Sequence, residues 1–225
     1  MSKKRVKQYL MLLTVVGLVS IASGSGTFAT FSAETTNAGN TFATGTIVLS
    51  NTVNAGSACL SSGSGGGVDT NINAACSAVF NATVQKPGTS ALNDLDLLNS
   101  GSLDAATLKL TAGACVASDA AGQSFHGTGN PCTALDVYVQ EWDDAVHTTA
   151  IHCWYGGAVV ANTCDFSDNT KTLAALATAS PLTLAGGLTG GAHRYFTIGV
   201  QLPSTAGNTY QGRAATDTLT WHIDQ

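Results

Sequence analysis

Apolar and polar residues alternate with a period of two over much of the chain, which is the pattern of strands that bury one face. The alternation is clear near the C-terminus, where Phe196, Ile198, Val200 and Leu202 share one face of residues 194–202. Similar patterns predict further strands at residues 46–52, 78–85, 90–98, 106–110, 135–142 and 216–223, and a hairpin with arms at 153–155 and 158–161 turning at Gly156 and Gly157.

A single stretch, residues 172–178, has a helical composition. Many short strands separated by turns, with no regular alternation of strands and helices, are typical of antiparallel sandwiches and jelly rolls. The pattern therefore predicts an all-β fold, an antiparallel β-sandwich that is jelly-roll-like and carries one short helix.

The first 29 residues have the pattern of a secretory signal. Four basic residues lie within the first seven positions, an apolar run follows at 9–22, and small residues lead to Thr27-Phe28-Ala29. The apolar run is too short to span a bilayer comfortably. We expect cleavage after Ala29, with an uncleaved anchor as the alternative. The predicted organisation is a signal peptide (1–29), an N-terminal segment (30–45) and one β-sandwich domain (46–225).

Charge is scarce and unevenly placed. The chain of 225 residues holds 9 basic and 14 acidic residues, a net charge of −5. Four basic residues fall in the signal, which leaves 5 basic against 14 acidic residues, a net charge of −9, beyond it. We do not expect nucleic-acid binding, because phosphate contacts need clustered Lys and Arg and only five basic residues remain beyond the signal. A hydrophobic content of 44% with little charge also disfavours disorder.

Six cysteines, an even number in a chain expected to be exported, predict disulfides. Spacings of 17, 17 and 11 residues favour pairing between neighbours, and each pair would close a segment rich in Gly, Ser or Asn. The expected bridges are Cys59–Cys76, Cys115–Cys132 and Cys153–Cys164. A metal site would need closely spaced cysteines, and the sequence has no CxxC motif.

Histidines and acidic residues offer few candidates for catalysis. The chain has five histidines but no HExxH motif and no GxSxG motif. His147 and His152 lie five residues apart on a predicted strand or loop, and this spacing puts them on opposite faces if the segment is a strand. They are a weak metal candidate with Asp143 and Asp144 nearby, because a solvated loop explains these aspartates equally well. His222 is expected to face outward on the last strand.

Two acidic pairs, Asp94 with Asp96 and Asp165 with Asp168, could resemble a carboxylate pair or a calcium loop. Their spacing does not fit an EF-hand, and exposed acidic edges explain them more simply. No cysteine is left as a nucleophile if all six pair. The sequence therefore predicts a protein that is not an enzyme, with no catalytic residues, no bound metal and no cofactor.

Residues 24–49 (GSGTFATFSAETTNAGNTFATGTIVL) resemble the N-terminal signature of the TasA/camelysin family: a small-residue run, a T-aromatic-A motif, a short Phe-containing segment and an N-x-F-A-x-G-T strand. Later landmarks agree in order, with a KPG turn at residues 86–88, an N-x-G-S-L turn at 99–103 and a YQG ending at 210–212. The six cysteines and long Gly/Ser loops depart from the pattern of TasA itself and indicate a divergent branch.

The resemblance implies a protein cut by a SipW-type signal peptidase and secreted to the cell surface or the biofilm matrix. It implies a jelly-roll-like β-sandwich that forms extracellular filaments when the N-terminal segment adds as a donor strand to the next copy. Residues expected to form the donor strand or its hinge are Thr30, Phe31, Ser32, Ala33, Glu34, Thr35, Thr36, Asn40 and Phe42. The expected partners are the signal peptidase, further copies of the chain, joined head to tail, and an accessory matrix protein.

Residues 30–40 suit this role because they contain no Pro or Lys and present Phe31 as an apolar knob. Such a segment can complete an open sheet edge through main-chain hydrogen bonds, and a head-to-tail contact that does not close propagates as a filament. The alternatives are a loose terminus or a strand that pairs within its own subunit. Two other functions remain open: a monomeric surface adhesin, and a camelysin-like surface metalloendopeptidase, for which the chain has no zinc motif.

Overall fold

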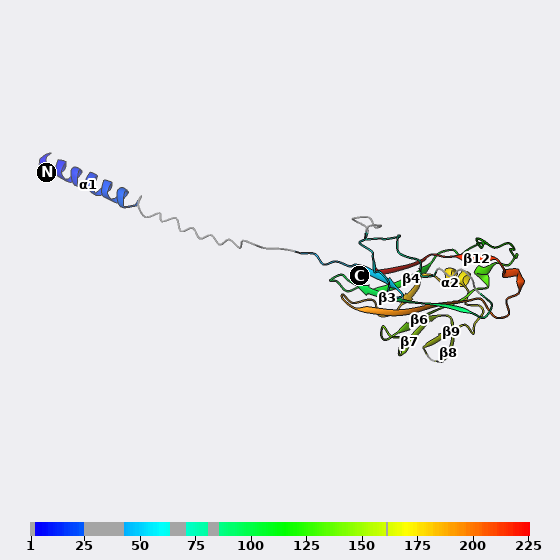
Figure 1. Ribbon diagram of the computed structural model, residues 1–225. Helices are drawn as coiled ribbons and strands as arrows, with labels where there is room; N and C mark the ends of the chain where they lie inside the picture. The colour runs from blue at the N-terminus through cyan, green and yellow to red at the C-terminus, as the bar shows by residue number, and fades with distance from the viewer. Residues whose placement is uncertain (1–2, 25–42, 64–70, 81–85, 161) are drawn as a thin grey trace. The chain divides into compact units, whose positions relative to one another are not determined.

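The computed structural model describes residues 3–24, 43–63, 71–80, 86–160 and 162–225 (Figure 1). The chain divides into two units, residues 1–43 and 44–225. In the first unit, helix α1 (Lys3–Gly24) contains the apolar run expected at the core of an export signal. No helix within the described ranges is long and apolar enough to cross a membrane.

The second unit is built from antiparallel sheets (Figure 1). The largest has six strands in the order β2 (Cys59–Leu60), β1 (Leu49–Val53), β3 (Ser90–Asn99), β11 (His193–Gln201), β6 (Asp136–Trp142) and β7 (Ala150–Tyr155). A second sheet has three strands in the order β10 (Leu182–Leu184), β4 (Thr107–Ala112) and β13 (Leu219–Asp224).

Shorter elements complete this unit. Two small sheets pair β12 (Arg213–Thr216) with β5 (Val116–Asp119) and β8 (Gly157–Val160) with β9 (Thr163–Asp165). The helical elements are α2 (Leu173–Ala179) and two 3-10 turns, η1 (Pro131–Thr133) and η2 (Asn208–Tyr210). Thr172 caps α2 by accepting a hydrogen bond from the Ala175 N–H at 3.3 Å, as a threonine at an N-cap does.

The core lies where the six-stranded and three-stranded sheets pack together. Leu95 and Leu97 of β3 are buried, as the alternation in the sequence predicted. Phe196 of β11 lies against Trp221 of β13, with ring centroids 5.1 Å apart, so side chains of the two sheets meet directly. Leu176 of α2 is fully buried in the same cluster. The fold is therefore all-β and sandwich-like, with one short helix in this unit, and the predicted fold class is confirmed.

The predicted hairpin at residues 153–161 is wrong. Strand β7 pairs with β6, whereas β8 pairs with β9, so the chain turns out of the large sheet at Gly156 instead of folding back on itself. Gly156 has a φ of 126°, and a Cβ at this position would lie 2.5 Å from the Cβ of Tyr138. Only glycine fits at this position, where the chain leaves β7 and enters β8, which pairs with β9.

Two other predicted strands differ in extent. Of the strand predicted at 78–85, residues 78–80 are not in a strand and residues 81–85 lie outside the described residues. The strand predicted at 216–223 is divided, because β12 ends at Thr216 and β13 begins at Leu219. The two pieces pair with different strands, β5 and β4, so the break moves the chain from one sheet to another.

Candidate functional site

All six cysteines form the disulfides expected from their spacing: Cys59–Cys76, Cys115–Cys132 and Cys153–Cys164. The third bridge joins β7 to β9 and so fastens the small β8–β9 sheet to the large one. The predicted pairing is confirmed, and no cysteine remains as a thiol.

The predicted donor strand, Thr30 to Phe42, and the predicted cleavage site at Ala29 lie outside the described residues. The chain that follows them enters the sandwich at a defined place. The N–H groups of Ser102 and Leu103 donate to the Thr46 carbonyl oxygen at 2.8 and 3.0 Å. Leu49 then pairs with Asn99 at the end of β3. Residues 46–49 therefore lie at the Asn99 end of the large sheet.

Among the described residues, β13 has a strand partner on one side only. It pairs with β4 through all six of its residues without a bulge. The other six-residue strand at a sheet edge, β7, carries two register shifts against β6, and bulges of this kind discourage further pairing. The remaining edge strands of the two main sheets, β2 and β10, have two and three residues. β13 is thus the long, regular edge of the sandwich.

The inward side of β13 is incompletely covered. Trp221 is only 8% exposed, yet its indole Nε1–H has no hydrogen-bond partner. Leu219 and Ile223, on either side of it along the same face, are only partly buried against the core. Buried donors without a partner are rare in folded proteins. The apolar face of β13 thus combines two partly covered side chains, Leu219 and Ile223, with the unpaired indole N–H of Trp221.

Charges near the end of β13 are neutralised within the domain. Lys109 Nζ lies 3.1 Å from Asp224 Oδ2, and the other carboxylate oxygen lies 2.6 Å from His222 Nε2. Hydrogen bonds from Lys109 and then from His222 hold the pKa of Asp224 below its ordinary value. His222 is exposed, as predicted. An edge without an unpaired lysine offers little electrostatic resistance to an added strand.

The acidic residues considered as metal ligands support local turns. Asp165 and Asp168 accept hydrogen bonds from the N–H groups of Ser167 and Thr170, at 3.0 and 2.9 Å. Asp144 likewise accepts from the Thr148 N–H at 3.0 Å. In the part of the chain that the structure describes, no group of three or more His, Cys, Asp or Glu side chains could hold a metal ion.

The sequence left open whether His147 and His152 lie on a strand or a loop, and the structure divides them between the two. His152 lies in β7, but His147 is in the preceding turn with a φ of 58°. There it stacks on Trp142, with ring centroids 5.3 Å apart, and its Nδ1 lies 3.3 Å from an Asp94 carboxylate oxygen. The turn thus places His147 over the outer face of the large sheet, beside Asp94 of β3.

A buried ion pair was not expected from the sequence. The Glu141 carboxylate accepts hydrogen bonds from Arg194 Nε and Nη2 at 2.6 and 2.7 Å, and from Trp154 Nε1 at 2.6 Å. Arg194 also donates to the Gly187 carbonyl oxygen at 3.1 Å. A signal was present, because Arg194 is in phase with the buried Phe196 in the alternating pattern. The pair ties β6, β7 and β11 to a neighbouring loop.

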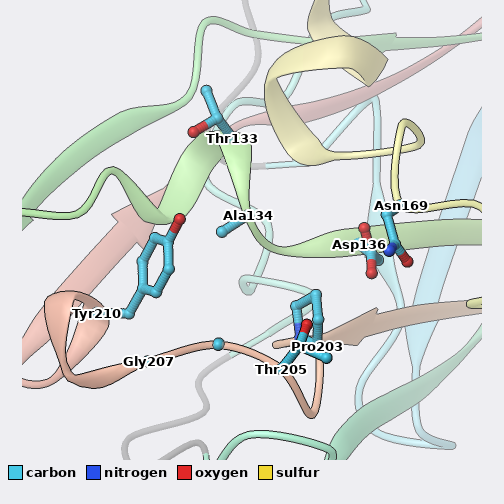
Figure 2. Close-up of a pocket in the computed structure, with 9 residues that line it drawn as sticks. Thr133, Ala134, Asp136, Asn169, Pro203, Thr205, Gly207 and Tyr210 are labelled. Carbon is cyan, nitrogen blue, oxygen red and sulfur yellow. The ribbon is translucent and has the colours of Figure 1, made fainter.

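A small cavity was also missed. It has a volume of about 220 Å³ and lies at the end of the large sheet opposite to Asn99, where β11 ends and β6 begins (Figure 2). It is lined by Thr133, Ala134, Asp136, Asn169, Pro203, Thr205, Ala206, Gly207 and Tyr210. These residues come from three separate stretches of sequence, so no local motif marks the site.

No protein-family model matches the chain, and no curated protein matches it. The open edge of β13, the three disulfides and the cavity therefore carry the functional inferences.

Proposed function

We propose that the chain is a structural subunit of an extracellular filament, such as a biofilm matrix fibre, which grows when the N-terminal strand of one copy adds to a sheet edge of the next. The observation that carries this proposal is the edge of β13 (Leu219–Asp224), which is regular, unpaired on one side within the described residues, and bordered by the unpartnered indole N–H of Trp221. An added strand would supply main-chain partners along this edge.

The N-terminal segment is long enough for this role. Cleavage after Ala29 leaves 14 residues, 30–43, before the domain begins. Fully extended, they reach about 46 Å at roughly 3.3 Å per residue. The six residues of β13 cover about 20 Å at roughly 3.4 Å per residue. The segment can therefore cover the whole edge and still span a gap to the next subunit.

Composition and covalent structure fit an exported polymer. Three disulfides form readily in oxidising compartments outside the cytosol. Beyond the signal the chain keeps only Lys86, Lys109 and Lys171, of which Lys109 is paired with Asp224. Lysine on an edge strand is a common protection against strand addition. Its scarcity here favours a chain that pairs edge to edge.

Imaging tests the proposal. The chain beginning at Thr30 is purified and examined by negative-stain electron microscopy, beside a chain lacking residues 30–40. A matched control replaces residues 30–40 with Gly and Ser at the same length, which keeps the tether but removes Phe31. We expect filaments for the first chain only. Equal filaments from all three chains, or a monomer with chelator-sensitive proteolytic activity, would contradict the proposal.

A second candidate, a monomeric surface adhesin, is favoured by the outer face of the large sheet. Trp142 stacks with His147 there, and His193 stacks with Tyr195 at a centroid distance of 5.7 Å. His193 Nδ1 also lies 2.7 Å from an Asp96 carboxylate oxygen. Partly exposed rings beside carboxylates can hold a ligand that has both apolar and polar faces. A Tyr195→Ala variant that loses cell binding but still forms filaments would separate the two functions.

A further inference from the structure

The cavity at the Asp136 end of the large sheet is built around one buried carboxyl group. Asp136 is the first residue of β6 and pairs with Gln201, the last residue of β11. Its side chain lines the cavity although the residue is only 2% exposed (Figure 2). Its Oδ1 has no hydrogen-bond partner. A buried acceptor with no partner carries a large desolvation cost, so it indicates a missing donor.

The electrostatic surroundings of Asp136 favour a cationic donor. Burial, and then the nearby charge of Asp168, raises the pKa of the Asp136 carboxyl to about 6. No described basic side chain lies within ion-pair distance of it. An anion would be repelled by both carboxylates, and a neutral hydroxyl would leave the buried charge uncompensated. A cation with N–H donors satisfies both the charge and the orphan oxygen.

The walls restrict the size and shape of that cation. The volume of about 220 Å³ lies below the range of roughly 300–1,000 Å³ that is usual for drug-sized ligands. Ala134, Pro203 and Ala206 supply apolar surface, and the ring of Tyr210 borders the same space (Figure 2). Aliphatic walls suit an alkyl stem, and an aromatic ring can attract an ammonium group. Only one carboxylate lines the cavity, which is too few for a calcium site.

We propose that this cavity binds a primary ammonium group on an unbranched alkyl stem, with the ammonium donating to Asp136 and the stem lying between Pro203 and Tyr210. Two sources share this chemistry: a small alkylamine, or a lysine side chain of a second copy. Of the lysines beyond the signal, Lys86 is the candidate that remains, because Lys109 is bound to Asp224 and the ammonium of Lys171 lies 5.4 Å from the centre of the Tyr155 ring.

The probe is n-butylamine, titrated into the full chain at pH 8 and followed by NMR chemical shifts. We expect saturable binding that shifts residues 133–136 and 203–210. Asp136→Asn is expected to lower the association constant at least about tenfold, because it removes a charge-assisted hydrogen bond. Asp104→Asn is the matched control, since that aspartate accepts from the Gly190 N–H near the opposite end of the sheet. It is expected to bind as the wild type does.

Two further arms keep the result decisive. Ala134→Leu fills the cavity without touching the carboxyl and is expected to abolish binding as well. Neutral n-butanol is expected not to bind. Binding is also expected to weaken below pH 6 as Asp136 becomes protonated, with Asp168, Lys171, Tyr155 and Tyr210 as the other titratable groups near it. No saturable binding of butylamine, equal binding of butanol, or unchanged affinity in Asp136→Asn would overturn the assignment.

Sedimentation equilibrium identifies the source of the ammonium. A self-association that n-butylamine competes away, and that Lys86→Gln abolishes, assigns the site to lysine of a second copy. The site is assigned to small amines if butylamine binds but changes nothing in the association state, and if Lys86→Gln leaves that state unchanged as well. The same variants are also measured in the chain lacking residues 30–40. Filament growth through the N-terminal strand then cannot obscure the self-association that this test measures.

Discussion

Arg194→Met is the most direct perturbation of the sandwich that the structure suggests. The Arg194 side chain is 12% exposed and that of Glu141 is 4% exposed, so their ion pair is largely shielded from water. The variant removes both guanidinium hydrogen bonds to the carboxylate. It leaves Trp154 Nε1 as the remaining close donor, at 2.6 Å. The carboxylate would then be buried without a permanent cation beside it, because its remaining ion-pair partner is His152 Nδ1, 3.7 Å away, which is charged only when protonated.

The magnitude can be worked from these contacts. Hydrogen bonds to charged groups contribute about 1.5–3 kcal/mol each, so two of them give roughly 3–6 kcal/mol. Measured losses on breaking one side of a buried ion pair are about 3–5 kcal/mol. The methionine keeps part of the packing against Phe196, whose ring centroid lies 5.5 Å from the guanidinium carbon. We therefore expect the free energy of unfolding to fall by about 3–4 kcal/mol.

Urea unfolding followed by far-ultraviolet circular dichroism measures this loss. Arg213→Met is the matched control, because Arg213 pairs with Asp119, whose side chain is 57% exposed, and such pairs contribute less than about 1 kcal/mol. A Glu141→Leu/Arg194→Met double variant is expected to recover much of the loss, since it removes the uncompensated charge. The reasoning is refuted if Arg194→Met costs no more than Arg213→Met, or if the double variant is less stable than Arg194→Met.

Three further outcomes are expected. Replacing Cys115 and Cys132 with alanine opens a loop of 17 residues and should lower the free energy of unfolding by about 3 kcal/mol, measured by urea unfolding. Folding raises the pKa of Asp136 from 3.8 to about 6, so ionisation of this carboxyl destabilises the fold as pH rises. Asp136→Asn should therefore raise the free energy of unfolding by roughly 3 kcal/mol at pH 8 and by almost nothing at pH 3.5. Equal effects of the substitution at the two pH values would contradict this. Trp221→Phe keeps a six-membered aromatic ring but removes the unpaired N–H together with the rest of the five-membered ring. The lost packing alone should cost about 2 kcal/mol in thermal unfolding, and a loss above about 4 kcal/mol would show that the N–H has a partner.

Local patterns were sufficient for much of the fold. The alternation of Leu95 and Leu97 with Asp94 and Asp96 correctly predicts which side of β3 is buried, because a strand turns successive side chains to opposite faces. The cysteine spacings gave the correct disulfides because each pair closes a short loop. These features depend on residues that are near one another in sequence.

The features that sequence reasoning missed depend on contacts between distant residues. The hairpin wrongly predicted at Gly156 is an exception, because β8 pairs with β9, only two residues further along the chain, while β7 pairs with β6. Glu141 and Arg194 are 53 residues apart and become neighbours only when β6 pairs with β11. The cavity at Asp136 likewise forms only when three separate stretches of the chain come together, and the alternation of apolar and polar residues does not predict that contact.

Hydrogen exchange at β13 tests the central claim most directly. A synthetic peptide of residues 30–42 is added to the chain lacking residues 30–40, and the exchange rates of the amides of Leu219–Asp224 are measured by NMR. We expect alternate amides along β13 to become protected, because an added strand bonds every second residue on the edge that faces it. A scrambled peptide is expected to leave the rates unchanged. Binding of the peptide without protection in β13, or no binding at all, would contradict strand addition at this edge.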